Sequence, residues 1–391
     1  MDFALTDEQK MMIATVRRFI AQELRPLEQE VEDQGFLAAE KARAIFEKSR
    51  ELGLYGMNMP EELGGMGLSA VDTMLMEEQF GHTTDILIRR AFGNVYEVLL
   101  ACKGEQVERW LKPSVAGDRV CSIAITEAGA GSDAGGITTR AVQQADGSWR
   151  LTGAKHFISD GEVSDFFVVS AITGEANGKK QISLFLVDRG LPGFALGKDQ
   201  KMMGLRGTSH LELWFDNVPL EPLALLGDEG KGLAQALGVL GRVRLAQVGA
   251  RAVGKASHVL DLMADYAQQR KQFGQPIANF QMMQQMLADS VIEVNAARLM
   301  VWRAAWMIDQ GQDARDWIAM VKVYAAEMLG RVVDRAVQVF GGMGFCKELP
   351  IERYYRDARI YRIFDGTSEI HRTVIARSLG KQGRALFDVE A

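Results

Sequence analysis

The hydrophobic pattern of the chain changes twice, and these changes constrain the fold most. In the first part, Thr6 and Gln9 form a capping-box pair, and apolar residues follow at helical spacing. In the second part, short apolar runs such as 166–171 and 182–187 are separated by Gly, Asp and Asn. No helical segment lies between these runs to make parallel crossovers, so we expect antiparallel strands. In the third part helical spacing returns, beginning with Leu233 and Leu237.

The pattern predicts an α+β, mainly α protein of three domains. We expect an N-terminal helical domain over residues 1–120, a middle antiparallel β-domain over 121–230 and a C-terminal helical domain over 231–391. At 391 residues the chain is long enough for two or three domains or for one subunit with a large core.

Composition excludes several classes of protein. The net charge of -6, without a basic run, argues against nucleic acid as a partner. The three cysteines are far apart in the sequence, which indicates free thiols in a reducing compartment. The histidines show no metal-ligand spacing, so no metal site is expected. We expect a cytoplasmic enzyme, because the acidic N-terminus is unlike a signal peptide and no apolar run could span a membrane.

One carboxylate near the C-terminus lies in a setting that suits a general base. Asp365 occupies a turn between an apolar dipeptide and a helix that starts near Ile370 and has its predicted end at Gly380. Partial burial would raise its pKa, and helix N–H groups would orient it. The alternative is an ordinary Asp-Gly turn pair.

A glycine-rich run lies near the start of the middle domain. Gly129, Gly131 and Gly135 suggest a dinucleotide-binding loop, but a Rossmann fingerprint must open a helix. The residues that follow, 136–141, have the pattern of a strand. The run is therefore either a plain connection or a cofactor loop of another kind.

Several motifs, in order, resemble those of acyl-CoA dehydrogenases. The resemblance covers nearly the whole chain and implies that family's fold: an N-terminal helical domain, a middle β-domain and a C-terminal four-helix bundle. The motifs that carry it are Ile125–Asp133, Leu151–Ser159, Arg270–Gly274 followed by Phe280-Gln281, Gln338–Gly342 and Arg356–Ile370.

The resemblance implies FAD as the cofactor, held in two parts. In the middle domain, Thr126 would bond the flavin ring edge, Ser132 the pyrophosphate, and the Ser159 hydroxyl would donate toward flavin N5. In relatives the C-terminal motifs meet the FAD pyrophosphate and adenosine across a subunit interface. The further residues assigned to FAD by this match are Gly131, Phe157, Ile158, Arg270, Gln272, Phe273, Gln281, Gln338, Gly341, Gly342, Thr367 and Glu369. Read without the resemblance, Phe157 and Ile158 could be strand core and Arg270 a solvated helix charge.

The same resemblance assigns a base and a substrate site. The residue before Gly-Thr-Ser removes the substrate α-proton in the family, and here it is Asp365 instead of the usual Glu. Arg242 falls where relatives place an arginine beside the CoA arm. Arg89 and Arg90 fall near the helix that floors the acyl pocket, where they could bind a polar or carboxylated tail; the alternative is a pair of surface arginines. Ser132, Phe364 and Gly366 complete the predicted substrate contacts.

These assignments predict FAD-dependent α,β-dehydrogenation of an acyl-CoA to a 2-enoyl-CoA. The expected partners are an electron-transfer flavoprotein and further copies of the chain, in a dimer of dimers. Because Asp replaces Glu at position 365, two alternatives stay open. One is a flavin oxidase of the nitroalkane type, and the other is a non-catalytic family member that acts in binding or assembly.

Overall fold

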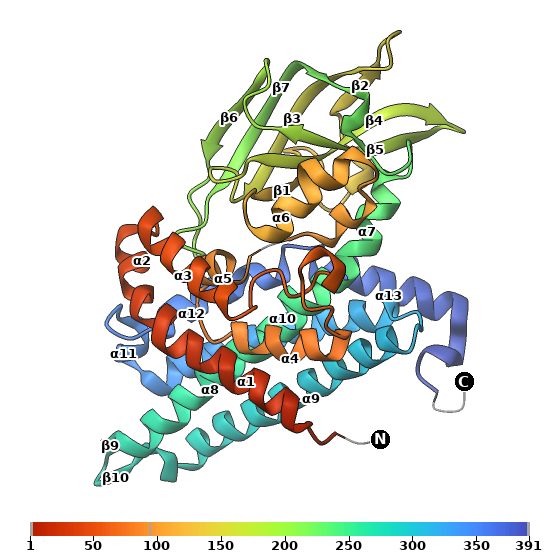
Figure 1. The fold of residues 1–391 in the computed structure, drawn as a ribbon. Coiled ribbons are helices and arrows are strands. Elements are labelled where there is room, and N and C mark those ends of the chain that lie inside the picture. Colours follow the sequence, from red (N-terminus) through yellow and green to blue (C-terminus); the bar gives the residue numbers. More distant parts are fainter. Residues whose placement is uncertain (1–2, 94, 389–391) are drawn as a thin grey trace.

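The computed structural model describes residues 3–93 and 95–388, and it consists of two helical parts and a β-sheet. The sheet lies at one end of the molecule, and the N-terminal and C-terminal helices pack together at the other (Figure 1). Helix, then sheet, then helix is the predicted order. Among the described helices, none combines the length and the apolar character that a membrane crossing needs.

The N-terminal part is helical, as predicted. Its first helix is capped by Thr6, whose hydroxyl accepts from the Gln9 amide at 3.1 Å while the Gln9 side chain accepts from the Thr6 amide at 3.0 Å. The predicted capping box is therefore confirmed. The helices are α1 (Asp7–Phe19), α2 (Glu28–Gln34), α3 (Ala39–Glu51), α4 (Ala70–Phe80), α5 (Asp85–Phe92) and α6 (Lys112–Ala116).

The middle part is a sheet with the strand order β6-β7-β3-β2-β4-β5-β8, in which β1 pairs with β4. Its strands are β1 (Cys121–Ala124), β2 (Arg140–Gln143), β3 (Trp149–Ser159), β4 (Phe166–Ala176), β5 (Lys179–Asp188), β6 (Phe194–Asp199), β7 (His210–Leu220) and β8 (Leu225–Leu226).

Most strand pairs are antiparallel, as predicted, but β1 runs parallel to β4. β2 also pairs with β4 in parallel, through a single pair of residues. The expectation of purely antiparallel pairing was therefore wrong for these strands. A parallel pair needs a long crossover, and here β2 and β3 provide it in place of a helix.

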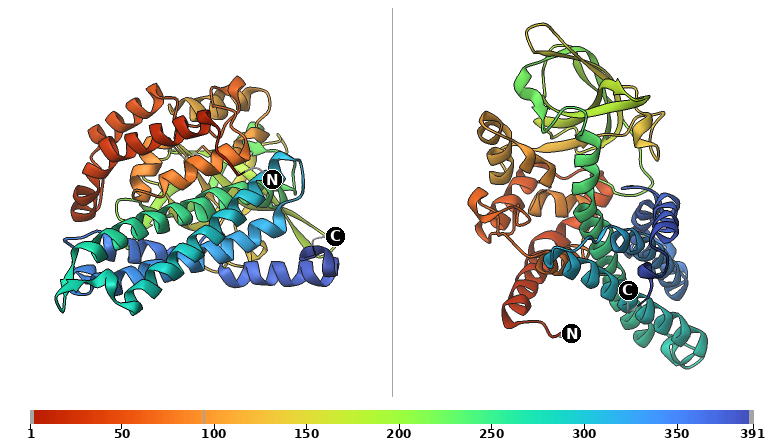
Figure 2. Two further views of the ribbon diagram at one scale, coloured as in Figure 1. Left: turned by 90° about the horizontal axis from the view of Figure 1, so that it is seen from below. Right: turned by 90° about the vertical axis from the view of Figure 1, so that its right-hand side faces the viewer.

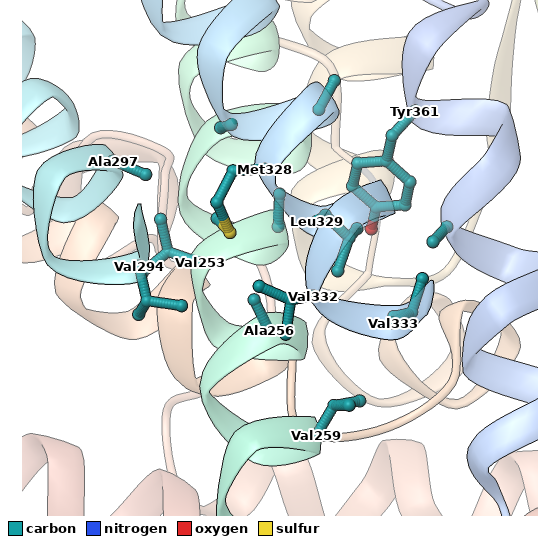
Figure 3. Packing of buried hydrophobic residues seen from close by; sticks show 14 of the residues in the cluster. Val253, Ala256, Val259, Val294, Ala297, Met328, Leu329, Val332, Val333 and Tyr361 are labelled. Atoms are coloured by element: carbon teal, nitrogen blue, oxygen red, sulfur yellow. The ribbon is translucent and has the colours of Figure 1, made fainter. Parts of the chain in front are cut away.

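The C-terminal part is built around α10, which contacts α8, α9, α12 and α13. Small and branched apolar side chains from α8, α9 and α10 interlock in its core (Figure 3). The elements are α7 (Gly232–Val243), α8 (Arg251–Gln269), β9 (Lys271–Gln272), β10 (Gln275–Pro276), α9 (Gln281–Asp309), α10 (Arg315–Phe340), α11 (Gly342–Phe345), α12 (Ile351–Ala358) and α13 (Ser368–Gln382).

Two glycines near helix ends behave differently. Gly341 ends α10 with φ of 61°. Gly380 lies inside α13, which ends instead at Gly383 with φ of 57°. The helix continues past Gly380 because glycine weakens a helix without forcing it to stop.

The N-terminal helices lie along one face of the C-terminal helices (Figure 2). The closest approach joins α4 to α8 at Gly254, where an added Cβ would lie 1.8 Å from the carbonyl oxygen of Glu78. Only glycine fits at this position, and the tight contact fixes the two helical parts against each other.

Candidate active site

Four residues with an unusual backbone lie on segments that carry sequence motifs or beside them. Positive φ angles occur at Phe157 (59°), Asp160 (59°), Phe273 (49°) and Asp365 (54°). A non-glycine residue in this region is strained by about 1–3 kcal/mol, so it persists only where its surroundings hold it. Such positions are frequent at functional sites, and they are a starting point for finding one here.

Asp365 lies in the turn before α13, and two side chains hold its backbone. The Arg244 Nε donates to the Asp365 carbonyl at 2.7 Å, and the His371 Nε2 lies 3.2 Å from the same oxygen. Burial lowers the pKa of His371 to about 4, so the imidazole is neutral at pH 7. A neutral ring that carries its proton on Nε2 donates to that carbonyl.

The segment that carries Arg244 is π-helical. Residues Arg244–Ala250 form π-helical turns between α7 and α8, and these turns are wider than those of a regular α-helix. Inserted π-turns of this kind shift the faces of a helix and are frequent at functional sites. They bring the guanidinium of Arg244 to the turn at Asp365, 121 residues further along the chain.

The carboxyl group of Asp365 has the electrostatics of a proton acceptor. The surrounding protein displaces water and raises its pKa, while Arg244, Lys322, Arg89 and Arg251 act in the opposite direction. The residue stays partly exposed, and no described residue donates a hydrogen bond to its carboxylate oxygens. It can therefore be reached by a ligand and still hold a proton more tightly than a solvated aspartate.

The two middle-domain motifs lie side by side. The His156 amide donates to the Thr126 carbonyl at 2.8 Å, which ties the loop after β1 to β3. The hydroxyl of Ser122 donates to the Ser159 carbonyl at 2.6 Å and ties the end of β3 to β1. The structure thus places Thr126 and Ser159 on two neighbouring segments, the loop after β1 and the end of β3.

A buried ion pair stabilises the loop after β1. Lys155 Nζ donates to Glu127 at 2.9 Å, and the amides and hydroxyls of Thr138 and Thr139 donate to the same carboxylate. Burial alone would raise the pKa of Glu127, but these hydrogen bonds lower it to about 2. The carboxylate therefore stays ionised and keeps the loop fixed.

The side chains of the second motif divide between surface and core. The pairing of β3 with β7 shifts register between Lys155 and Ile158, and such bulges re-aim side chains. Phe157 is 50% exposed, so it is not strand core, whereas Ile158 is buried. The aromatic face of Phe157 and the backbone of Ile158 are what the end of β3 presents to a ligand.

The two middle-domain motifs fit a flavin. The hydroxyls of Thr126, Ser132 and Ser159 offer donors, and Phe157 offers an exposed aromatic face. Gly131 is exposed, and nothing lies within 4 Å of a Cβ built on it, so a phosphate can approach the backbone.

The C-terminal residues assigned to FAD form a second cluster at the opposite end of the molecule. Near the end of α8, which leads into the β9–β10 hairpin, Tyr266 stacks on Phe340 at the end of α10 with a ring distance of 4.2 Å. Phe273 on the hairpin is 91% exposed. All the C-terminal residues assigned to FAD in this cluster are exposed: Arg270, Gln272, Phe273, Gln281, Gln338, Gly341 and Gly342.

One chain does not bring the two clusters together, because the hairpin and the sheet lie at opposite ends (Figure 1). Thr367 and Glu369 lie elsewhere again, at the start of α13. Thr367 caps this helix by accepting from the Ile370 amide at 3.2 Å, and Glu369 is exposed.

Arg89 and Arg90 are largely buried, so the surface alternative does not hold. Arg89 Nη1 lies 2.9 Å and Arg90 Nη2 3.0 Å from the two carboxylate oxygens of Asp160, and the side chains are 14% and 16% exposed. Both line a cavity of about 340 Å³ between α3, α5 and the sheet. The triad carries one excess positive charge at this cavity.

Of the remaining predicted substrate residues, Arg242 lines a second cavity. This cavity has a volume of about 70 Å³ and is also lined by Tyr96 and Glu97. Burial raises the pKa of Glu97, an effect that Arg242 opposes. Phe364 packs edge-on against Tyr361 at 5.1 Å, and Gly366 follows Asp365 with φ of 88°.

The residues that surround Asp365 are not among the predicted site residues. Arg242 is one of the predicted substrate residues, but Arg244, two positions later, is the arginine that contacts the turn at Asp365. His371 and the buried Lys322 are likewise not predicted. No local signal marks the π-helical turns, because they arise from packing against α10 and not from residue type.

Family models match the chain in three consecutive parts. The N-terminal domain of acyl-CoA dehydrogenases matches residues 6–118, the middle domain residues 122–218 and the C-terminal domain residues 230–380.

Whole-length relatives agree with these matches. The chain is 38% identical to acryloyl-CoA reductase (NADH) of Anaerotignum propionicum, covering 98% of this chain and 97% of the relative. It is 36% identical to the human mitochondrial short-chain specific acyl-CoA dehydrogenase, covering 97% of this chain and 92% of the relative. The butyryl-CoA dehydrogenase structure from Megasphaera elsdenii superposes with a TM-score of 0.89 at 32% identity, covering 97% of this chain and 100% of that one.

Proposed function

The chain belongs to the acyl-CoA dehydrogenase family, whose members are flavin-dependent oxidoreductases, and from this premise we propose that Asp365 is the base that dehydrogenates an acyl-CoA. One observation carries the proposal. The carboxyl group of Asp365 is accessible and has a raised pKa, and Arg244 fixes the backbone carbonyl of the same residue. A general base works best when its pKa approaches that of the proton it removes.

FAD supplies the hydride acceptor, flavin N5, and a ribityl hydroxyl near the thioester. The residues of the two middle-domain motifs fit its binding: Phe157 would pack on the ring, Thr126 would bond the ring edge and the Ser159 hydroxyl would donate toward N5. Ser132 and Gly131 are exposed and would contact phosphate, with Ser132 also near the CoA arm, and Ile158 would flank the ring.

The chain's own part in the reaction centres on the turn at Asp365. Its carboxylate takes the α-proton, and its backbone N–H donates to the thioester carbonyl as negative charge develops there. Arg244 and His371 hold the Asp365 carbonyl, so the peptide group between Asp365 and Gly366 keeps a fixed direction and anchors the turn that carries the base. Phe364 and Gly366, on either side, form the walls of this site, and Arg242 lies toward the CoA arm.

Aspartate is one methylene shorter than the family's usual glutamate, which removes about 1.5 Å of reach, and a misplacement of about 1 Å can cost 10²-fold in rate. We propose that the short base selects a particular acyl group. Arg89 and Arg90 share the single carboxylate of Asp160, so they leave one net positive charge at the cavity of about 340 Å³ that they line. This charge favours an acyl tail with a carboxylate or another polar end.

Two copies of the chain complete the FAD site in this proposal. The exposed cluster on the hairpin and α10 cannot reach the middle-domain motifs of its own subunit, but it can serve a partner's. The exposed Phe273 favours burial in such an interface. We propose a dimer of dimers, with an electron-transfer flavoprotein as the electron acceptor.

The test is anaerobic mixing of the purified holoprotein with a panel of acyl-CoA thioesters and nitroalkanes, followed through the flavin absorbance. We expect bleaching by one class of acyl-CoA and reoxidation by an electron-transfer flavoprotein. Bleaching by nitroalkanes alone, with fast turnover on O₂, would identify an oxidase. FAD that no compound in the panel bleaches would identify a non-catalytic binding protein.

A further inference from the structure

Lys322 is a buried ammonium group without a hydrogen-bond partner. Its side chain is 0% exposed, and its Nζ has no hydrogen bond to any described residue. Burying an ammonium group is costly unless an opposite charge compensates it. A lysine held in this way in the core of the C-terminal helices therefore calls for a nearby anion.

The packing of α10 brings this helix against the elements on both sides of the turn at Asp365. Lys322 is on α10, which packs against both the π-helical segment Arg244–Ala250 and α13. These two elements flank the turn at Asp365. Asp365 is the charged group that acts most strongly on Lys322, and neither of its carboxylate oxygens has a hydrogen-bond donor among the described residues.

The other carboxylates near Lys322 are already engaged or solvated. Glu327, on the same helix, pairs with Arg362 at 3.0 Å and with Arg372 at 3.7 Å. Glu369, at the start of α13, is exposed. This leaves Asp365 as the carboxylate whose charge Lys322 can complement.

We propose that Lys322 is a positioning residue that keeps the carboxylate of Asp365 ionised, and so able to accept a proton, through its charge across the interface of α10 and the Asp365 turn. The inference rests on the proposed role of Asp365 as the base. Arg244 from the π-helical segment, Arg89 from α5 and Arg251 from α8 add to the same field.

The directions in which the pKa values of both groups are shifted agree with this role. Burial lowers the pKa of Lys322 to about 8, an effect that Asp365 opposes. Burial raises the pKa of Asp365, which Lys322 opposes. His371 on α13 stays neutral at pH 7, so it does not compete with Lys322 as a cation. Loss of the ammonium charge must therefore raise the pKa of Asp365 further.

The experiment compares the holoprotein with its Lys322→Met and Lys322→Arg variants in two measurements. One is the pH profile of flavin reduction by the acyl-CoA that bleaches the wild type. The other is an infrared titration of the protonated carboxyl band that disappears in Asp365→Asn, which needs no turnover. Lys255→Met is the matched control, because Lys255 is equally buried on α8 but donates to the Thr83 carbonyl at 2.9 Å.

We expect Lys322→Met to move the Asp365 titration and the acid limb of the rate profile up by about one pH unit, which is a rate about tenfold lower below that limb. Lys322→Arg should restore both, and Lys255→Met should leave both in place. An unmoved carboxyl band in Lys322→Met, or in Lys322→Gln if the Met variant does not fold, would overturn the inference. A moved band with a rate that does not follow it would instead reject Asp365 as the base.

Discussion

Two aspartates of this chain, Asp160 and Asp365, share an unusual backbone but have opposite acidities. Both have positive φ, at 59° and 54°, and both are contacted by arginine. Burial pushes the pKa of each upward, but Arg89 and Arg90 bring that of Asp160 below its usual range. The pKa of Asp365 stays raised.

The difference is which atom the arginine contacts. At Asp160 both guanidinium groups donate to the carboxylate itself and stabilise its charged form. At Asp365 the guanidinium of Arg244 donates to the backbone carbonyl, so it fixes the position of the residue, and none of the residues that the structure describes donates to the carboxylate. One aspartate is thereby a structural anion and the other is suited to accept a proton.

The largest expected effect follows from removing the proton acceptor. Asp365→Asn keeps the shape and the backbone N–H of the turn, so FAD and acyl-CoA should still bind. Flavin reduction should fall by about 10²- to 10⁴-fold, as is typical for loss of a general base. Stopped-flow absorbance measures this rate. An unchanged rate would mean that Asp365 only makes an Asp-Gly turn.

Removing the other aspartate should affect stability more than chemistry. Asp160→Ala leaves two largely buried guanidinium groups without a counter-charge, and breaking such a pair costs about 3–5 kcal/mol. Arg90→Met leaves a neutral Arg89–Asp160 pair and should cost less. Urea unfolding of the FAD-saturated proteins compares them. If Arg90→Met is instead less stable than Asp160→Ala, the protein needs the excess positive charge of Arg89, Arg90 and Asp160 for its stability.

A smaller effect is expected where Arg244 holds the turn. Arg244→Met removes the donor to the Asp365 carbonyl, and the resulting misplacement of the base should slow flavin reduction by about 100-fold. Arg244→Lys keeps the charge but not the Nε geometry. Single-turnover rates at saturating acyl-CoA distinguish the two contributions. Full activity in Arg244→Lys would show that the charge of Arg244 matters and its hydrogen bond does not.

The smallest effect is on the pH dependence of stability, and its sign differs between the two aspartates. A raised folded-state pKa means that wild-type protein loses stability from Asp365 as the pH rises from about 3.9, the unfolded value, through the folded one. Asp365→Asn should therefore have the higher Tm at neutral pH, and the difference should vanish at acid pH. A melting series across pH measures it, and equal Tm values at neutral pH would contradict the raised pKa.

For Asp160 the sign is reversed. Its lowered pKa gives stability that is present above the unfolded value and is lost as the pH falls through the folded one. Asp160→Asn should then lie below wild type in Tm at neutral pH and approach it in acid. The same melting series measures both variants. If the Tm at neutral pH changes in the same direction in Asp365→Asn and Asp160→Asn, the result contradicts the comparison.

Much of the fold could be predicted, because it depends on local patterns. The capping box at Thr6 and the return of helix near Leu233 follow from capping residues and apolar spacing within a few positions. The parallel pairing of β1 with β4 could not be predicted, because a register between strands more than 40 residues apart leaves no mark on either strand.

For the candidate site, the sequence by itself determined which residues are available: the turn at Asp365, the flavin-loop motif and the paired arginines all stand in the printed chain. Only the tertiary structure decided how they are charged and held. Asp160 meets its arginines across 70 and 71 residues, and Asp365 meets Arg244 across 121. A pKa depends on the water and the charges around a group, and these are set by contacts that no local pattern encodes.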